Sequence, residues 1–130
     1  MIDDPLIERG QPICSSSSIE VSGLAFRFRI KNTDIQSWKN AEPTDEIQAA
    51  FVLRSRDSVF AYLNLCAHLP MQLDWIPGQF LTMDKSHIVC SSHGAEFTIE
   101  KGECVFGPCP AGSGLVSIPV IERDGWIYLK

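Results

Sequence analysis

The chain has 130 residues, a formal net charge of −5 and 45% hydrophobic residues, which is typical of one globular domain with one core. No apolar run approaches the ~18 residues of a membrane span, and no basic run suggests nucleic acid or an anionic membrane as a partner. The acidic start of the chain lacks the basic and then apolar layout of a secretory signal. We therefore expect a single cytoplasmic domain over residues 1–130.

The first half of the chain predicts a lead-in followed by three strands. Residues 1–18, which include four consecutive serines, predict a weakly ordered lead-in. Apolar and polar residues then alternate over 24–30, which is the period of a half-buried strand. Residues 31–46 are polar and predict a loop. Two further strands follow over 47–54 and 59–65, joined by a polar hairpin turn.

The second half predicts a series of hairpins after a loop over 69–78, which carries two prolines and a glycine. The turns lie at Asp84-Lys85, Lys101-Gly102 and Arg123-Asp124-Gly125, and Asp-Gly between apolar runs is a strong hairpin signal. The strands beside these turns cover 80–83 and 87–89, 96–99 and 103–105, and 116–121 and 126–129. Many short strands at this spacing indicate an all-β fold, an antiparallel β-sandwich or barrel, with at most a turn or two of helix.

Two short motifs carry metal-binding chemistry. Cys66-Ala67-His68 and Cys90-Ser91-Ser92-His93 each offer one soft thiolate and one imidazole. If the two loops converge, they form a site with two sulfur and two nitrogen ligands. Two metal groups suit such a donor set, a structural zinc ion and a two-iron cluster.

The pairing of the ligands favours the two-iron cluster over zinc. The familiar mixed zinc site pairs two cysteines on one knuckle and two histidines on a helix, whereas this chain pairs unlike ligands and predicts no helix there. In a [2Fe–2S] cluster, each loop would give one iron its cysteine and the other its histidine. Replacing two thiolates by neutral imidazoles removes negative charge and raises the reduction potential.

The residues around these motifs resemble the Rieske family. The family pattern is Cys-x-His, a spacer, and Cys-x-x-His-Gly, which the chain matches with Gly94 after the second motif. The resemblance covers about residues 45–130, with residues 19–45 as a first strand. The further matching residues are Phe97, Gly102, Gly107-Pro108 and Asp124-Gly125.

The resemblance implies a Rieske-like antiparallel sandwich with a small cluster-binding subdomain, whose cluster loops lie at about 64–75 and 88–97. It implies one [2Fe–2S] cluster, with four ligands. It implies that the two cysteines bind the inner iron and the two histidines the outer, solvent-near iron. The domain would transfer one electron and turn over no substrate itself. The implied ligands are Cys66, His68, Cys90 and His93.

The chain departs from the Rieske proteins of cytochrome bc complexes at several positions. Met71 and Ser92 stand where those proteins have a disulfide that joins the two loops. Ala95 and Phe97 stand where they have hydroxyl donors to the cluster. Because hydrogen bonds to cluster sulfurs stabilise the reduced state, their absence predicts a lower potential. The chain is therefore expected to be a Rieske-type ferredoxin.

Three cysteines and one histidine remain outside the proposed ligand set. In a reducing cytoplasm, Cys104 and Cys109 are expected to be reduced and packed, and Cys14 to be a spare thiol. His87 precedes the second motif on a strand and is expected to face solvent without a role.

The functional hypothesis is a carrier that moves one electron between a reductase and a terminal oxidoreductase or oxygenase. Both partners would dock near His68 and His93, beside an apolar rim that includes Leu69, Met71 and Trp75. The chain would then be an electron-transfer component, not a stand-alone enzyme. Two alternatives stay open: a small subunit of a multi-component oxidoreductase, and a structural zinc or interaction module on the same fold.

Overall fold

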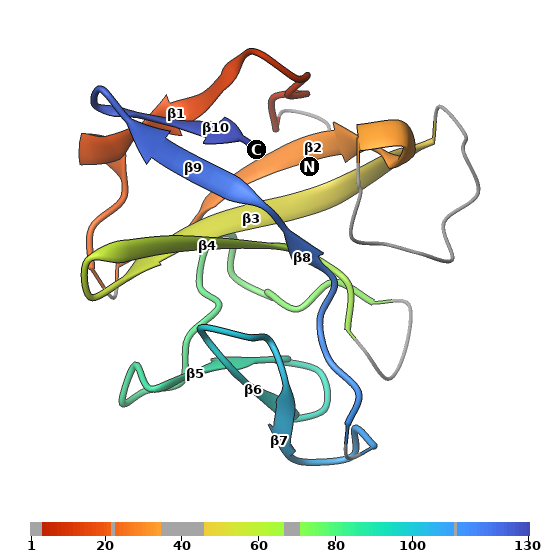
Figure 1. The fold of residues 1–130 in the computed structure, drawn as a ribbon. Coiled ribbons are helices and arrows are strands. Elements are labelled where there is room, and N and C mark those ends of the chain that lie inside the picture. Colours follow the sequence, from red (N-terminus) through yellow and green to blue (C-terminus); the bar gives the residue numbers. More distant parts are fainter. Residues whose placement is uncertain (1–3, 22, 35–45, 67–70, 111) are drawn as a thin grey trace.

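The computed structural model of the chain describes residues 4–21, 23–34, 46–66, 71–110 and 112–130. Within these ranges the strands form three antiparallel sheets, joined by loops and two short 3-10 turns, η1 (Ser16–Ser18) and η2 (Asn32–Asp34). Two sheets form the upper part of Figure 1, and the third forms a smaller part below them. The all-β antiparallel prediction is confirmed.

Two of the sheets have three strands and one has four. The first sheet has the order β1-β10-β9, with β1 (Pro12–Ser15), β10 (Trp126–Leu129) and β9 (Val120–Arg123). The second has the order β2-β3-β4-β8, with β2 (Phe26–Lys31), β3 (Ile47–Ser55), β4 (Ser58–Leu63) and β8 (Ser117–Ile118). The third has the order β5-β6-β7, with β5 (His87–Val89), β6 (Glu96–Thr98) and β7 (Cys104–Phe106).

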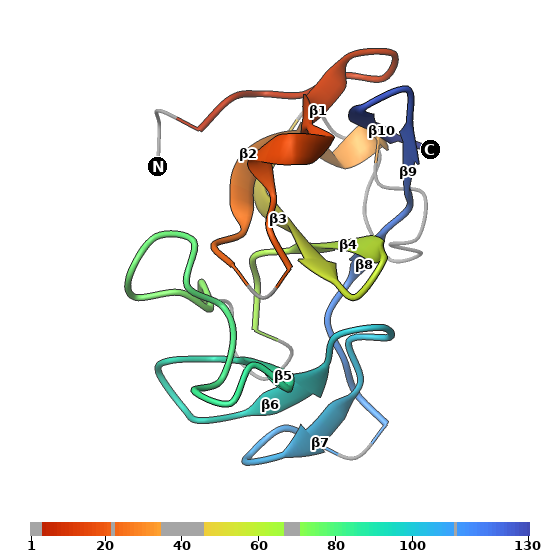
Figure 2. The same cartoon turned by 90° about the vertical axis from the view of Figure 1, so that its left-hand side faces the viewer.

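Strand β3 is buried on both faces because it separates two hydrophobic cores. Ala50 and Val52 belong to the core between the first and second sheets, whereas Phe51 and Leu53 belong to the core above the third sheet. Successive side chains of a strand point to opposite faces, so one apolar run serves both cores. Figures 1 and 2 show β3 and β4 between the first sheet and the β5–β7 subdomain.

The cores divide most of the buried apolar residues of the described chain. The upper core comprises Ile7, Ile13, Cys14, Ile19, Phe28, Ile30, Ala50, Val52, Ala61, Leu63, Ile118 and Ile127. The lower core comprises Phe51, Leu53, Tyr62, Cys66, Leu73, Phe80, Ile88, Cys90, Ala95, Phe97, Ile99, Cys109 and Leu115. Both cysteines of the predicted metal site therefore lie in the lower core.

The predicted lead-in is wrong for the part of residues 1–18 that the structure describes. β1 pairs antiparallel with β10, and Arg29 both donates to and accepts from the backbone near the start of the chain. Ile7 and Ile13 are buried in the upper core. The segment is ordered because the far end of the chain supplies the strand on which it packs.

Two other predicted elements differ in extent. The strand expected over 116–121 is divided into β8 and β9 at Pro119, which has no N–H to continue a ladder. Residues 80–83 form no strand of their own, although Leu81 bridges Ile88 and the predicted turn at Asp84-Lys85 is present. The remaining predicted strands agree with the structure to within a few residues at their ends.

The turn between β9 and β10 has the predicted chemistry. Arg123 pairs with Trp126 across it, and Asp124 and Gly125 have φ angles of 51° and 82°. Two consecutive residues with positive φ define the tight hairpin turn for which Asp-Gly is favoured. No helix in the part of the chain that the structure describes is long and apolar enough to cross a membrane.

Candidate metal centre

The first ligand loop begins where β4 ends. Cys66 lies after β4 with 4% of its surface exposed, and its backbone N–H donates to the Met71 carbonyl at 2.8 Å. This bond brings the two ends of the loop together. His68, the predicted histidine ligand of this loop, lies outside the described residues, as does Leu69 of the predicted rim.

The second ligand loop is a tight turn after β5. The Cys90 carbonyl accepts the N–H groups of His93 at 3.3 Å and of Gly94 at 2.8 Å, and Cys90 N–H donates to the Ala95 carbonyl at 2.8 Å. Gly94 has a φ of 73°, a conformation that a residue without a Cβ adopts at little cost. The turn carries His93 back toward Cys90, with Cys90 Sγ and His93 Nδ1 3.6 Å apart.

The structure brings three of the four predicted ligands together. One ligand atom from each of Cys66, Cys90 and His93 lies within 4.8 Å of the others. Both cysteines are free thiols, and His93 is only half-buried. Two buried sulfurs and a half-buried imidazole from separate loops fit a small iron–sulfur cluster with a cysteine end inside and a histidine end near solvent.

Without a bound cation, the environment of Cys90 favours the neutral thiol over the thiolate. Burial raises the pKa of the Cys90 thiol, the backbone N–H groups of Ser92 and His93 lower it, and the neighbouring Cys66 raises it further. Two thiolates side by side in a dry core therefore need a positive charge between them. A bound metal supplies that charge and displaces the protons.

The loop after β7 packs against the second ligand loop. A Cβ atom on Gly107 would lie 2.7 Å from Ala95 Cα, so only glycine allows this close approach. Gly107 has a φ of 95°, which also favours glycine. Gly107, which the sequence pattern also matched, thus lies directly on the turn that carries Cys90 and His93.

The expectation that Cys104 and Cys109 are reduced is wrong. They form a disulfide with a Cα–Cα separation of 6.2 Å, which lies in the range for such bridges. The expectation rested on the compartment, whereas the pairing depends on β7 and the following loop folding back on each other. Cys14 is buried and free, as a spare thiol should be.

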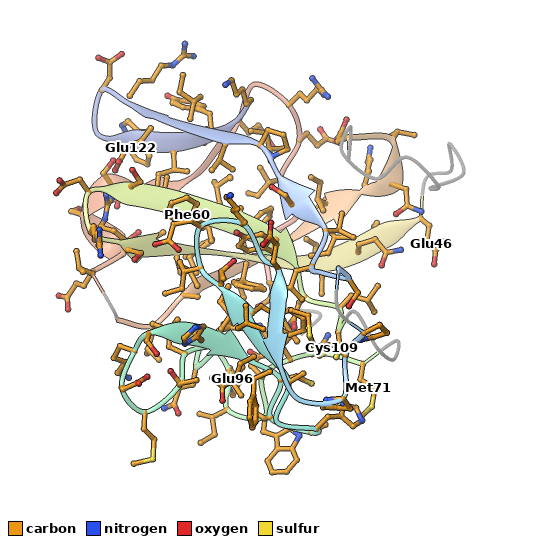
Figure 3. The ribbon with its side chains drawn as sticks, turned by 60° about the horizontal axis from the view of Figure 1, so that its bottom comes forward. Glu46, Phe60, Met71, Glu96, Cys109 and Glu122 are labelled. Atoms are coloured by element: carbon orange, nitrogen blue, oxygen red, sulfur yellow. A yellow bond between two sulfur atoms is a disulfide. The ribbon has the colours of Figure 1, made fainter. Side chains whose placement is uncertain are left out.

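Trp75 and Met71, which the sequence predicted to form an apolar rim, lie on the surface of the site. Trp75 is 71% exposed and Met71 41%, and Trp75 Nε1 donates to Ser92 Oγ at 3.0 Å. Trp75 thus connects the two ligand loops from outside. His87 is half-buried on β5, with Nδ1 2.8 Å from Ser86 Oγ, and it is not among the three grouped ligand residues. Figure 3 shows Met71 and Cys109 in the part of the molecule that holds β5–β7.

A buried polar group beside the first ligand loop has no counterpart in the sequence analysis. Asp74 accepts hydrogen bonds from Arg27, Asn64 and Gly78, and its side chain is fully buried. An asparagine just after a strand and an aspartate in a loop follow no periodic pattern. The only signal available was the predicted loop over 69–78, which placed Asp74 among turn residues.

Comparison with known proteins agrees with this geometry. The sequence model of the Rieske [2Fe-2S] domain family matches residues 11–121 of the chain. Among curated proteins, none matches the chain in sequence. The solved structures that share its fold over nearly the whole of both chains include the following three.

The first of these is the ferredoxin of carbazole 1,9a-dioxygenase from Nocardioides aromaticivorans IC177, with a TM-score of 0.64, 19% identity, and 94% of this chain and 97% of that chain covered. The second is the Sphingomonas yanoikuyae B1 ferredoxin, with a TM-score of 0.63, 22% identity, and coverage of 92% and 96%. The third is a complex of reduced oxygenase and oxidized ferredoxin in carbazole 1,9a-dioxygenase, with a TM-score of 0.61, 21% identity, and coverage of 92% and 100%.

The antiparallel fold and the mixed sulfur–nitrogen donors fit the class of iron–sulfur proteins. The chain belongs to the Rieske [2Fe–2S] domain family. The prediction of one [2Fe–2S] cluster is therefore confirmed. This result also favours the two-iron cluster over structural zinc.

Proposed function

We propose that Cys66 and Cys90 hold the inner iron of the cluster and that His68 and His93 hold the outer iron. The burial of both cysteines and the half-burial of His93 support this assignment. The grouping of three ligand atoms within 4.8 Å is the observation that carries it. His68 completes the set by its position in the first motif.

The residues around the ligands have distinct tasks in this proposal. The bound cluster supplies one-electron redox chemistry. The lower core excludes water from Cys66 and Cys90, and the hydrogen-bonded turn after β5 holds His93 at the surface of the subdomain. An imidazole near solvent shortens the distance over which an electron must pass to a docked partner. The apolar surface of Trp75 and Met71 lies beside that exit.

We propose that the chain carries one electron from a reductase to a terminal oxygenase or other oxidoreductase, with both partners docking near His68 and His93. The similarity in fold to a ferredoxin in a complex with its oxygenase supports this direction of transfer. The net charge of −5 would steer the carrier toward a basic docking surface. In the alternative, the chain is a small subunit of a multi-component oxidoreductase, and the same surface contacts the other subunits permanently.

We also propose a cytoplasmic location for the chain. The Cys104–Cys109 disulfide argues in the other direction, because structural disulfides are rare in reducing compartments. Fractionation of the source cells, with detection of the untagged protein, tests the location. Recovery from an oxidising compartment would refute it.

The cluster assignment is tested by analysis of the purified protein. We expect two iron and two labile sulfide atoms per chain, as the cluster formula requires. After reduction by dithionite, the protein should show an electron paramagnetic resonance signal with the low average g value of histidine-ligated clusters. A colourless protein with one zinc per chain would overturn the assignment.

Free carrier and permanent subunit are distinguished by hydrodynamic size. A free carrier at native concentration should migrate as a small protein in clarified cell extract, and a subunit should migrate with a large complex. Detection of the cluster signal across the size-exclusion fractions gives the answer.

A further inference from the structure

The Asp74 carboxylate is fully buried and each of its oxygens is occupied. Asp74 Oδ1 accepts from Asn64 Nδ2 at 2.9 Å. Asp74 Oδ2 accepts from Arg27 Nη1 at 3.1 Å and from the Gly78 N–H at 3.0 Å. A buried carboxylate is tolerated only with such partners, so the position of Asp74 is strongly determined by them.

Asn64 uses both ends of its side-chain amide in the same way. Its Nδ2 donates to Asp74, and its Oδ1 accepts the N–H of Leu73 at 2.7 Å. The backbone N–H of Asn64 donates to the Ala49 carbonyl at 2.9 Å, which ties this residue to β3. Asn64 lies at the start of the first ligand loop and Leu73 and Asp74 lie near its end, so the two side chains join the loop's two stems.

The connection continues to the second ligand loop. The carbonyl of Leu73 accepts the N–H of Ser91 at 2.9 Å, and Ser91 follows Cys90 directly. A single hydrogen-bonded path thus runs from Asn64 through Leu73 to Ser91. It links the residue two positions before Cys66 to the residue next to Cys90.

We propose that Asn64 and Asp74 are positioning residues of the redox centre. They hold the stems of the first ligand loop together and thereby set where Cys66 lies relative to Cys90. The inference rests on the proposed ligand set, because it concerns the geometry of those ligands. Neither side chain is proposed to touch the cluster.

The arrangement allows a test by exchanging the two side chains. Asp74→Asn alone places an amide N–H₂ against the Asn64 amide N–H₂, so that two donors face each other. Asn64→Asp alone places a carboxylate oxygen against the Asp74 carboxylate. The double variant Asn64→Asp/Asp74→Asn restores each donor–acceptor pair. The new carboxylate at position 64 accepts from the Leu73 N–H and from the new amide N–H₂ at position 74. The amide oxygen at position 74 still accepts from Arg27 and from the Gly78 N–H.

The readout is the rate at which the oxidised holoprotein loses its visible absorbance to an excess of an iron chelator under native conditions. Each single variant should lose iron at least about tenfold faster than wild type, because a mismatched buried polar pair destabilises the loop by a free energy that corresponds to about that factor. The double variant should return to within about threefold of wild type, because pairs in direct contact do not behave additively.

A matched control is the ion pair between Arg54 and Glu122, which is also partly buried and joins β3 to β9. Figure 3 shows Glu122 at the opposite end of the molecule from Met71 and Cys109. Glu122→Gln should lower the resistance to urea without changing the reduced-state paramagnetic spectrum. The single variants at 64 and 74 should broaden or shift that spectrum and recover it in the double variant.

The outcomes separate this inference from the proposed function. A wild-type protein without iron and sulfide overturns both. A cluster-loaded wild type whose single variants match Glu122→Gln in spectrum and iron loss overturns the positioning role alone, as does a double variant whose loss is the product of the single losses. If a single variant does not fold, recovery of folded, cluster-loaded protein by the double variant supports the inference, and failure of the double overturns it.

Discussion

His93 and Cys90 come from one short turn but lie at different depths. Cys90 is fully buried beneath the turn, and His93 is half-buried on it. The hydrogen bonds from His93 N–H and Gly94 N–H to the Cys90 carbonyl fix this difference, because they reverse the chain within four residues. One turn can therefore present sulfur to the interior and nitrogen to the surface.

Removing the His93 imidazole should release the cluster. We expect His93→Ala to lose most of its iron and visible absorbance on purification, because the outer iron loses a ligand and gains access to water. His87→Ala is the control, since His87 is half-buried on β5 and outside the ligand group. Equal iron content in the two variants would count against His93 as a ligand.

A hydroxyl at position 95 should raise the reduction potential. Ala95 is buried, and its carbonyl accepts the Cys90 N–H, so a serine side chain there would lie in the dry region around the ligands. We expect Ala95→Ser to raise the potential by tens of millivolts, because a hydrogen bond to a more negative, reduced site stabilises that state.

The potential is measured by redox titration of the visible band. Ala61→Ser is the matched control, because Ala61 is equally enclosed but belongs to the upper core. A shift of the same size in both variants would show that the hydroxyl acts through general packing and not through the centre.

At the scale of elements, β3 connects the two halves of the molecule. It pairs with β2 and β4 and contributes side chains to both cores. On its lower face, Phe51 stacks on Phe80, with ring centroids 3.8 Å apart and planes inclined by 11°. On the upper face of β3, near the end of the strand, Arg54 donates hydrogen bonds to the Glu122 carboxylate and to the carbonyls of Ile19 and Ser16. The strand thereby anchors β9 and the N-terminal segment above and the cluster subdomain below.

The Arg54–Glu122 ion pair should make stability depend on acid pH. The hydrogen bond from Arg54 lowers the pKa of the Glu122 carboxyl below its ordinary value of 4.5. A depressed folded-state pKa contributes stability that is fully present above the unfolded value and is lost as the pH falls through the folded value. Wild type should therefore exceed Glu122→Gln at neutral pH by about 1 kcal/mol in the free energy of unfolding.

The measurement is urea unfolding of both proteins at neutral pH and at a pH well below the folded-state pKa of Glu122. The difference between them should vanish in acid. A difference that stays constant across this range would show that the glutamine acts by packing and not by loss of charge.

Seen as a whole, the β5–β7 subdomain lies below the two upper sheets and shares the lower core with the second sheet, through residues of β3 and β4 (Figures 1 and 2). That core encloses Cys66 and Cys90 together with Cys109 of the disulfide. The Rieske proteins of cytochrome bc complexes, as described above, join the two ligand loops by a disulfide. This chain instead closes the loop after β7, which packs on the second ligand loop through Gly107.

The disulfide predicts the number of free thiols. After removal of the cluster and denaturation without reductant, three thiols should react with a thiol reagent, namely those of Cys14, Cys66 and Cys90. Five reactive thiols would show that Cys104 and Cys109 are reduced. Cys104→Ser/Cys109→Ser should lower the free energy of unfolding by about 2 kcal/mol, the value expected for a short closed loop, as measured by urea unfolding without reductant.

Much of the fold was predictable because its signals are local. The alternation ending at Ile30 and the Asp124-Gly125 turn depend on neighbouring residues only, and both appear as expected. The ordering of residues 4–18 was not predictable, because β1 pairs with β10 at the other end of the chain. The Cys104–Cys109 disulfide was not predictable either, because it depends on β7 and the following loop folding back on each other. The division at Pro119, by contrast, has a local cause, the missing N–H of proline.

The sequence by itself determined the chemistry of the centre: two cysteine–histidine motifs, each with one sulfur and one nitrogen donor, and the Rieske pattern around them. Only the tertiary structure decided that Cys66, Cys90 and His93 meet within 4.8 Å, with the sulfurs buried and the imidazole near the surface. The reason is physical. Donor type is a property of each side chain, whereas convergence depends on contacts between distant segments, such as Asn64 with Asp74 and Leu73 with Ser91.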